Sequence, residues 1–592
     1  MDDGQIVRER TPLHLPLSRY FFPQVVAYIL ARELGLPVFI WLVAGLSLLV
    51  FGGIVGYFSS RRKGAGEFSK LTFSRQANSR MDLPRRRWLW IPAVSFLLFA
   101  AYFEWREGDG EAVATFIAFP WPATETSVEI EIERLWSNTS EVRIAGIGRV
   151  LAAPAHARLA VGDRLVFDAY NEVAWKHPPW VGSRMLLRGV RTAIAVPAET
   201  ETLAPFTQQL LDQGVRLRLQ QATVLEVIYH AQPRWAERAN AALESQLRRA
   251  LPQATPLADV YVAMLLGKRV ALSEEQLQAF RETGTMHFFA ISGLHIKIIG
   301  LTLFFMLKGI RIPPVLSIVV GLCLLGLYVY VTGASPSAVR AFLMVFFFWL
   351  GATVSRRQHA PMAAWMNAAF LVLLLDPATL FLVGFQLSYA VVASIFLFGL
   401  PLLRVLLGLW EKQLDQWFPQ GVEKPRWVQC LLSGIMKWII TPFCIGLAAW
   451  LASTPLILIH FKLFVPGAVL LNIPLVLLCG GTLITGVLSL SSGLLGLGLI
   501  GSVLNYAAML FLWFMTLIVY CGHETWLSGI YLKHVLTTPA IIGLISFLLL
   551  SWQQEKRLAT GAPERKLTSF IPAVFLLALC SAIAIVGAWI LI

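Results

Sequence analysis

Long apolar runs separated by short polar segments fill most of the chain after Thr285. A helix needs about 20 apolar residues to cross a bilayer, and most of the runs approach that length. They predict spans near 285–307, 312–332, 340–355, 361–375, 380–402, 438–458, 467–489, 495–520, 538–552 and 570–592. With two earlier runs, Leu36–Phe58 and Trp88–Phe103, they predict a polytopic α-helical membrane protein of about twelve spans.

Two apolar segments fit a membrane span less well. Phe21–Leu34 is short and carries Arg32 and Glu33, which favours a partial or interfacial helix. Leu402–Trp417 is apolar on one side and charged on the other, the pattern of a helix that lies along a membrane surface. We expect it at the cytoplasmic interface.

Glu104–Gly284 interrupts the apolar pattern and is predicted to be an insert outside the membrane. In its first half, Val128–Glu133 alternates apolar and acidic residues, which is typical of a half-exposed strand. Val142–Val150 and Arg164–Ala169 are further strand candidates. Several short strands within about 70 residues favour a small barrel of the OB type.

The second half of the insert, from about Phe206 to Phe280, has a helical pattern. Trp235–Ala250 is amphipathic with a basic face, and Ser273 precedes acidic residues in the manner of a helix N-cap. We therefore divide the chain into an N-terminal membrane region with two spans and a basic loop (1–103), a β-rich domain (104–205), a helical connector (206–284) and the main transmembrane domain (285–592).

Composition and charge support a membrane protein and orient it. Hydrophobic residues make up 57% of the 592 residues and charged residues 14%, whereas soluble domains have ~45–50% and ~25%. The insert holds 19 basic and 22 acidic residues, and the rest of the chain holds 30 basic and 13 acidic residues. The excess cations lie in short loops such as Arg61–Arg87, which predicts that these loops are cytoplasmic and the insert extracytoplasmic.

No cofactor, metal site or catalytic site is predicted. The six cysteines lie in or beside apolar segments, have no metal-ligand spacing and resemble small buried apolar residues. A phosphate-binding GxxxxGK[ST] motif is absent from the sequence, so an ATP-driven step would need a partner.

Polar residues inside the apolar region are energetically costly, so they are the first candidates for function. Gly284–Lys297 has the highest density of them. His287 and His295 are eight residues apart, which on one continuous helix puts them on the same face with Ser292 nearby. The structural alternative is a helix–helix contact through Ser292 and Gly293.

Thr332–Ala341 holds the second polar cluster. Its glycine and proline residues can break a helix and leave free backbone groups beside Ser337 and Arg340. A guanidinium at this place can bind phosphate through two parallel hydrogen bonds. The alternative is an arginine that extends from a helix end to the membrane surface.

Two more clusters follow along the chain. Gln386 and Ser388 lie in one apolar run and fit either a polar lining or hydrogen bonds between helices. Pro455, followed by His460 and the segment Asn472–Pro474, predicts two broken helices of the kind that transporters use, or two simple kinks.

In this order, the clusters resemble the motifs of the ComEC family of competence proteins. The resemblance covers about Thr255 to Thr485, and the N-terminal region more loosely. Gly284–His295 resembles that family's G…HxxAxSGLH signature, and further matches lie at Ala263–Arg269, Gly333–Ala341, Val383–Ser388 and Ser453–Pro474.

The resemblance implies a multi-pass channel of the inner (cytoplasmic) membrane that takes up single-stranded DNA in natural transformation and is not an enzyme. Besides DNA and the lipid bilayer, the implied partners are a DNA receptor, a cytoplasmic ATP-driven helicase or translocase and a separate nuclease; a homo-oligomer is also compatible. The residues expected along the path are His287, Ser292, Gly293, His295, Ser337, Arg340, Gln386, Ser388, Pro455 and Asn472.

The sequence departs from the family in one respect. Many members end in a metallo-β-lactamase-like domain, whose HxHxDH cluster is absent from this sequence, so we expect no intrinsic metal-dependent nuclease activity. Two other functions stay open: a transporter or exporter of another polyanion or envelope precursor, and an intramembrane hydrolase that uses Ser292 with His287 or His295.

The charge of the insert is a poor match to DNA. Its net charge is −3, and nucleic-acid binding draws most of its affinity from cations placed against phosphates. A local basic face would have to compensate, and the candidates for such a face are Arg184/Arg188/Arg191 and Arg248/Arg249.

Overall fold

The computed structural model describes residues 24–31, 90–107, 123–135, 143–171, 179–194, 215–251, 255–268, 272–354, 361–417, 426–531 and 543–553, apart from a few single positions within these ranges, together with Leu210. The predicted spans Leu36–Phe58 and 570–592 and the basic loop Arg61–Arg87 lie outside the described residues. The chain forms two compact units, residues 1–119 with 358–382 and residues 120–357 with 383–592.

The first unit contains the helices α4 (Trp90–Glu107) and α13 (Pro361–Leu375), the 3-10 turn η4 (Pro377–Phe381) and a helical segment of residues 24–31. Tyr28 is fully buried and donates a hydrogen bond to the Leu373 carbonyl at 3.1 Å. Its ring packs against Phe99 and Phe103 of α4. The expected partial helix in Phe21–Leu34 is therefore confirmed over residues 24–31.

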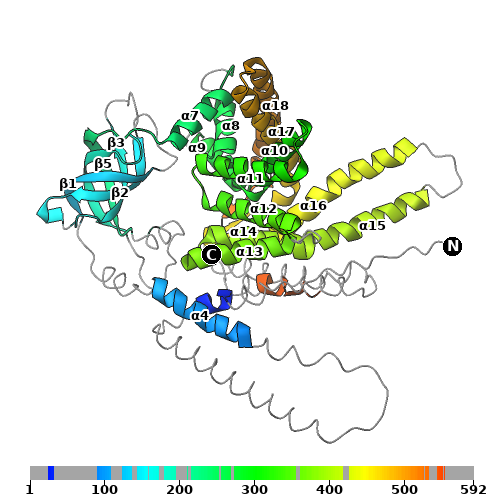
Figure 1. Cartoon of the computed structure of the whole chain (residues 1–592), viewed down its shortest axis with the longest axis horizontal. Helices are drawn as coiled ribbons and strands as arrows, with labels where there is room; N and C mark the ends of the chain where they lie inside the picture. Colours follow the sequence, from blue (N-terminus) through cyan, green and yellow to red (C-terminus); the bar gives the residue numbers. More distant parts are fainter. Residues whose placement is uncertain are drawn as a thin grey trace, which may run out of the picture. The chain divides into compact units, whose positions relative to one another are not determined.

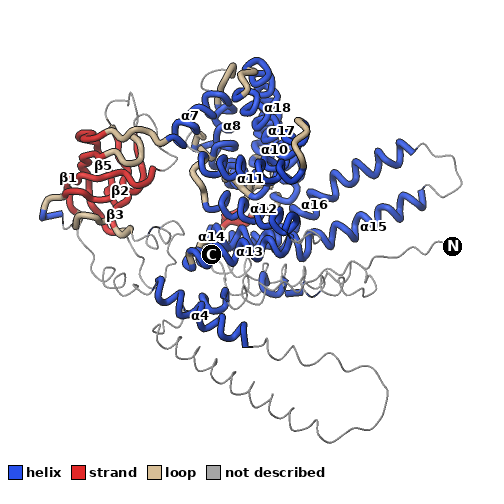
Figure 2. Tube along the Cα trace, viewed as in Figure 1, coloured by secondary structure: helices blue, strands red, loops and turns tan. Residues whose placement is uncertain are grey.

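A closed five-stranded barrel begins the second unit (Figures 1 and 2). In the barrel, buried and more exposed residues alternate along β1 as predicted, with Val128, Ile130 and Ile132 inside. The three predicted strands are confirmed as β1, β2 and β3. The strand order is β1-β2-β3-β5-β4, and all neighbours are antiparallel except β3 and β5. The strands are β1 (Thr124–Leu135), β2 (Arg143–Ala152), β3 (Arg164–Tyr170), β4 (Arg184–Ala193) and β5 (Leu217–Tyr229).

β5 corrects the helical pattern predicted for Phe206–Phe280. Val215, Leu217 and Leu219 are buried on alternate positions, but Gln221 has a positive φ of 49° and the pairing with β3 shifts register there. Because this bulge interrupts the alternation after a few residues, the strand is hidden in the sequence. The barrel extends to Tyr229 and does not end near residue 205.

The helical part of the connector is confirmed as α7 (Trp235–Leu247), α8 (Pro256–Leu266) and α9 (Glu274–Glu282). The predicted N-cap of α9 is also confirmed, because the Ser273 hydroxyl accepts a hydrogen bond from the Gln276 backbone N–H at 3.2 Å. The Gln276 side chain accepts one from the Ser273 backbone N–H at 3.0 Å in return.

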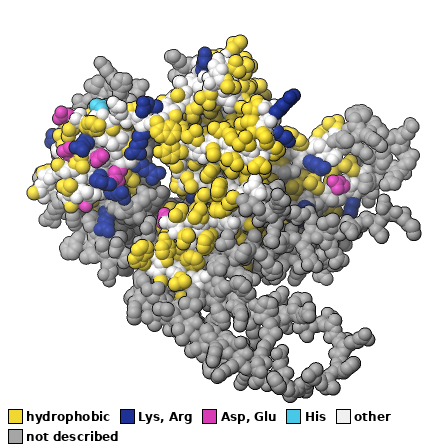
Figure 3. Space-filling view, viewed as in Figure 1, with side chains coloured by type: hydrophobic (Ala, Val, Ile, Leu, Met, Phe, Trp, Pro, Cys, Tyr) yellow, Lys and Arg dark blue, Asp and Glu magenta, His cyan; other side chains and the backbone are white. Residues whose placement is uncertain are grey.

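The apolar helices of the second unit include five stretches with the length and composition of membrane spans: Pro314–Val331, Val383–Leu414, Leu431–Phe461, Ala468–Leu494 and Gly498–His523. The space-filling view shows hydrophobic side chains over much of these helices (Figure 3). The individual helices are α10 (Gly293–Gly309), α11 (Pro314–Val331), α12 (Pro336–Val354), α14 (Val383–Ser394), α15 (Leu400–Trp417), α16 (Arg426–Phe461), α17 (Ala468–Leu494) and α18 (Gly498–His523).

Two further expectations about these helices need correction. The amphipathic segment Leu402–Trp417 is not a separate surface helix, because a π-helical turn, Ile395–Gly399, joins α14 to α15 without a break. Pro455 and Pro474 do not break their helices, which continue on both sides of each proline. The connector helix α8 packs on the bundle, since Ala258 and Val260–Leu266 are buried in one core with α17 and α18.

An ion-pair network joins α7 to α8 and to the Ala263–Arg269 motif. Arg248 donates hydrogen bonds to Glu244 at 2.9 Å and to Asp259 at 2.8 Å, and Lys268 donates to Glu244 at 2.7 Å. Burial raises the pKa of Glu244, but the hydrogen bonds and charges of Lys268 and Arg248 outweigh burial and leave this pKa below its ordinary value of 4.5.

This network predicts a pH dependence of stability. A carboxylate whose pKa is lowered by folding stabilises the protein above its unfolded pKa, and this contribution is lost as pH falls through the folded pKa. We therefore expect the Tm of the wild type to fall more steeply below about pH 4.5 than that of Glu244→Gln, which should have the lower Tm at neutral pH. Thermal unfolding of the purified protein in detergent tests this, and parallel curves for the two proteins would contradict it.

Candidate functional site

The site begins at a tight turn between α9 and α10. Gly284 has a positive φ of 71°, which ends the helical path after α9 and favours glycine. The hydroxyl of Thr283 donates to the Ala279 carbonyl at 2.7 Å and so closes the end of α9. The 3-10 turn η3 (Met286–Phe289) follows and buries both Phe288 and Phe289.

His287 and His295 do not share a helix face, so this prediction is wrong. His287 lies in η3, exposed, and its Nδ1 donates to the Gly284 carbonyl at 3.2 Å. Ser292 is extended, with φ −102° and ψ 175°, and α10 begins only at Gly293. The chain therefore changes direction between the two histidines, which a helical spacing rule does not capture.

Ser292 and His295 do meet, as their spacing predicts. The Ser292 Oγ lies 2.9 Å from the His295 Nδ1. His295 is fully buried, and its Nε2 has no hydrogen-bond partner among the residues that the structure describes. A Cβ built on Gly293 would meet no described atom within 4 Å, so the alternative of a helix–helix contact through Gly293 finds no support there.

α12 is tied to the same turn. The predicted break in Thr332–Ala341 is confirmed, because α11 ends at Val331 and α12 begins at Pro336. The Ser337 hydroxyl, in the first turn of α12, donates to the Ile291 carbonyl at 2.7 Å. The first and second polar clusters of the sequence therefore lie in contact.

Arg340 is one turn further along α12 and is only 4% exposed. Its Nη2 donates to the Gly384 carbonyl at the start of α14 at 2.9 Å. Within the described part of the chain, its Nε has no hydrogen-bond partner and no carboxylate forms an ion pair with it. A side chain so buried does not extend to the membrane surface, so that alternative for Arg340 is wrong.

Gln386 continues the connection to α16. Its Oε1 accepts a hydrogen bond from the His460 Nε2 at 3.2 Å. A series of contacts thus runs from the start of α10 through α12 and α14 to α16, in part through the carbonyls of Ile291 and Gly384. We call its side chains the polar chain: Ser292, His295, Ser337, Arg340, Gln386 and His460.

Besides His287 and Gly293, three predicted path residues stay outside the polar chain. Ser388 is half-buried in α14, and Pro455 is buried inside α16. Asn472 lies half-buried in α17, and its Oδ1 has no partner among the described residues. His460 belongs to the polar chain although it was not among the predicted path residues; its signal is a titratable side chain within an apolar run.

The basic faces proposed for the insert are largely engaged with other groups. Arg188 pairs with Glu125 at 3.0 Å, and Arg248 pairs with Glu244 and Asp259. Arg191 is buried, and its guanidinium donates to the Ala157 carbonyl at 2.9 Å. On the face of the barrel that Figure 3 draws, Lys and Arg lie together with Asp and Glu.

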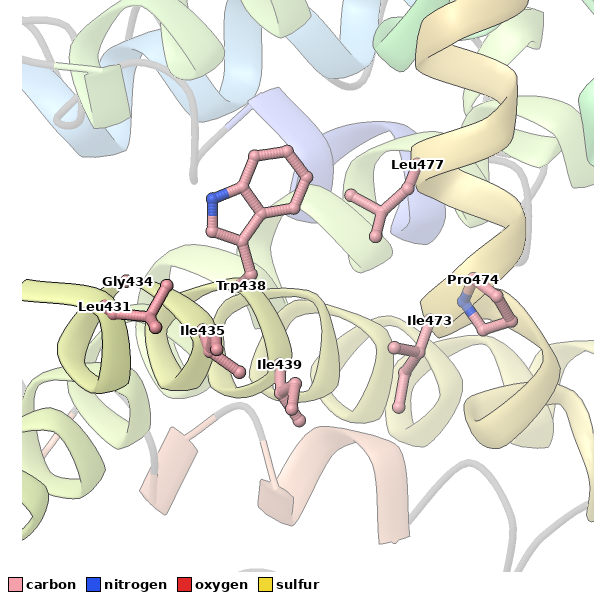
Figure 4. A pocket seen from close by; sticks show the side chains of 8 residues that line it. All are labelled: Leu431, Gly434, Ile435, Trp438, Ile439, Ile473, Pro474 and Leu477. Carbon is pink, nitrogen blue, oxygen red and sulfur yellow. The ribbon is translucent and has the colours of Figure 1, made fainter. Parts of the chain in front are cut away.

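A groove of about 650 Å³ lies between α16 and α17 (Figure 4). No predicted path residue lines it, although Ile473 and Pro474 adjoin Asn472. Apart from Gly434, its lining consists of apolar side chains: Leu431, Ile435, Trp438, Ile439, Ile473, Pro474 and Leu477. In the described ranges, no group of three or more His, Cys, Asp or Glu could hold a metal ion.

Comparison with known proteins shows which family the chain resembles. A family model described as "Competence protein" matches residues 264–556. ComE operon protein 3 of Bacillus subtilis (strain 168) is 38% identical over 136 residues, which are 23% of this chain and 17% of that protein. Recombination protein 2 of Haemophilus influenzae is 27% identical over 215 residues, 35% of this chain and 25% of that protein.

A third relative, the uncharacterized protein YcaI of Escherichia coli (strain K12), is 26% identical over 260 residues, 41% of this chain and 31% of that protein. The matched segments therefore span less than a third of each relative's length. No solved structure matches the chain.

In the described part of the chain, five helices have the length and composition of membrane spans, and five strands form a closed barrel. The protein is therefore a mainly helical membrane protein. The family model covers every residue of the polar chain. The resemblance of its motifs to the ComEC family of competence proteins is confirmed by the family model and by these relatives.

Proposed function

We propose that the protein is a multi-pass channel of the inner membrane that passes single-stranded DNA inward during natural transformation. The observation that carries this proposal is the family match over residues 264–556, which contains the whole polar chain. On this proposal the chain has about twelve spans, works without enzymatic activity of its own, and cooperates with a DNA receptor, an ATP-driven helicase or translocase and a separate nuclease.

The chemistry of Arg340 supports a polyanionic substrate. An arginine buried in an apolar bundle without a carboxylate is costly, because a buried charge needs a partner of opposite sign. The described contacts give it one backbone carbonyl and leave its Nε unpaired. A phosphate group of a passing strand would supply the missing negative charge through a bidentate contact.

The barrel supports a single-stranded substrate. Five strands in the order β1-β2-β3-β5-β4 fit a small closed barrel of the OB type, a fold that holds single strands by base stacking as well as by charge. Since four of its arginines, Arg143, Arg149, Arg164 and Arg188, form ion pairs with acids, we assign stacking the larger part in any contact between the barrel and DNA.

Uptake of labelled DNA into a nuclease-protected cytoplasmic fraction tests the channel. We expect a deletion strain to lose this uptake and the wild-type gene to restore it. Gln386→Ala, which breaks the polar chain, should restore it poorly. Ser388→Ala is the matched control because it lies two residues away, outside the polar chain, and should restore it fully. Normal uptake without the gene would rule out the channel and favour export of another polyanion.

One observation favours a second candidate, an intramembrane serine hydrolase. Ser292 and His295 are at hydrogen-bond distance, 2.9 Å, as a nucleophile and its base would be. Against it, no described group forms a hydrogen bond with the buried His295 Nε2, so an acid that orients the base is not seen among the described residues. Labelling of Ser292 by a fluorophosphonate, absent in Ser292→Ala and His295→Ala, would support the hydrolase over the channel.

A further inference from the structure

The turn between α17 and α18 is apolar and highly exposed. Leu494 is 83% exposed, Leu495 73% and Leu499 81%. The sequence has no Asp, Glu, Lys, Arg or His from residue 463 to residue 522, so no charged side chain of either helix accompanies these leucines. An exposed apolar cluster of this kind marks contact with a membrane or with another molecule.

The backbone of the turn forms its hydrogen bonds internally. Gly496 has a φ of 75°, the left-handed conformation that ends many helices. The Leu497 N–H donates to the Ser492 carbonyl at 2.8 Å, and the Gly496 N–H donates to the Gly493 carbonyl at 3.1 Å. The first N–H groups of α18 have no partner within the helix, as at every helix start, and lipid headgroup oxygens or interfacial water can accept from them.

The hydroxyl groups beside the turn are also satisfied within the hairpin. Ser491 and Ser502 donate to carbonyls one turn earlier in their own helices, at 2.8 and 3.0 Å. Ser492 donates to the Ser489 carbonyl at 2.8 Å. Lipid tails offer no hydrogen bonds, and these hydroxyls need none from their surroundings.

The exposed leucines continue the apolar face of α18. Along this helix, exposed apolar side chains recur every three or four residues, which places them on one face. The face contains Leu499, Val503, Tyr506, Leu510, Trp513 and Leu517, all at least 45% exposed. A membrane-spanning helix turns such a face to lipid, and here the face reaches the turn without a charged residue. The same surroundings therefore suit the helix and the turn.

The length of α18 places the turn inside the bilayer. The helix has 26 residues, which is about 39 Å at 1.5 Å per residue. At its other end, His523 lies 3.3 Å from the Glu282 carboxylate and Glu524 follows, so ionisable groups mark a membrane surface there. A bilayer with its headgroups is about 40–45 Å thick. The turn thus reaches the opposite headgroup region without passing beyond it, and any tilt of the helix draws it deeper.

A cation lies at the level of the turn. A Cβ built on Gly498 would be 2.5 Å from the Arg249 Cζ, so this guanidinium packs on the first residue of α18. Arg249 is exposed, and among the described residues no acid forms an ion pair with it. Lipid phosphates attract cations at this depth, which agrees with the placement of the turn at the headgroups.

We propose that the α17–α18 turn stays within the lipid bilayer, with Leu494, Leu495 and Leu499 against the acyl chains just below the phospholipid headgroups. The occupant of this surface is phospholipid and not a water-soluble protein or a nucleic acid. Acyl chains cover the leucines, and the turn has its own hydrogen bonds where acyl chains would supply none.

Fluorescence quenching by lipids tests the depth of the turn. The full chain, with its six cysteines replaced by alanine and with Leu499→Cys, is labelled with the fluorophore NBD. It is then placed in liposomes of phosphatidylethanolamine and phosphatidylglycerol. Phospholipids with a nitroxide near the headgroup end of the acyl chain should quench the label several times more strongly than iodide present on both sides of the membrane. Iodide quenching as strong as lipid quenching would overturn the proposal.

The control is Val161→Cys in the same background, which is 76% exposed in the turn before β3 of the barrel. Its label should be quenched by iodide and little by the lipids.

A second test keeps the six native cysteines. A photoreactive diazirine amino acid in place of Leu495, in the otherwise native chain, should form adducts mainly with phospholipids when host membranes are illuminated. Mass spectrometry of the adducts identifies the partner. Adducts formed mainly with a polypeptide would contradict the assignment and would make the turn a protein-docking surface.

Discussion

Arg340→Ala should reduce DNA uptake by about tenfold or more, while the amount of protein in the membrane stays unchanged. A charge-assisted hydrogen bond to phosphate contributes about 1.5–3 kcal/mol, and this variant removes the guanidinium from a site where it is 4% exposed. Arg340→Lys should reduce uptake partially, because an ammonium keeps the charge but not the planar pair of donors. Quantitative uptake of labelled DNA, normalised to membrane abundance, measures both effects.

Arg340→Gln separates the two roles that the structure allows. Glutamine retains a donor for the Gly384 carbonyl, to which Arg340 donates at 2.9 Å, but it has no charge. If Arg340 only ties α12 to α14, glutamine should restore uptake; if the charge meets phosphate, glutamine should behave like alanine. Normal uptake in Arg340→Ala would contradict any role at the DNA path. His295→Ala, which removes the partner of Ser292, should also impair uptake.

Local signals in the sequence predicted local structure well. The alternation in Val128–Glu133 predicted β1, and the Ser273 N-cap predicted the start of α9. β5 was missed because its bulge at Gln221 interrupts the alternation. The burial of α8 was missed because it depends on α17 and α18, which lie some 200 residues away along the chain. An apolar helix has the same pattern whether it connects domains or fills a core.

The candidate site, like the fold, could be predicted where the signal lies within one segment of the sequence, and not where it depends on contacts between distant segments. The polar clusters were visible because ionisable side chains in an apolar run are rare, and Ser292 and His295 meet because they are three residues apart. The links between clusters were not visible. Ser337 and Arg340 donate to the carbonyls of Ile291 and Gly384, and every residue has such a carbonyl, so no side-chain pattern shows which one is used.

A second large effect is expected at Asn505 of α18, which is fully buried. Its Nδ2 donates to the carbonyls of Gln246 and Arg249 at the end of α7, at 3.0 and 3.2 Å. Its Oδ1 accepts from Tyr261 of α8 at 3.2 Å and from Ser489 of α17 at 2.6 Å. One amide therefore joins four helices where the connector from the barrel meets the membrane bundle.

Asn505→Ala should lower the free energy of unfolding by about 2–4 kcal/mol, because it leaves several buried polar groups without partners and each costs about 1–3 kcal/mol. Tyr261→Phe removes one donor and leaves the Asn505 Oδ1 bonded to Ser489, so about 1 kcal/mol is expected. Ser502→Ala is the matched control on α18, since this hydroxyl donates only within its own helix, to the Gly498 carbonyl at 3.0 Å. Thermal unfolding in detergent should rank the variants in this order. If Asn505→Ala unfolds at the same temperature as Ser502→Ala, the amide does not hold the connector to the bundle.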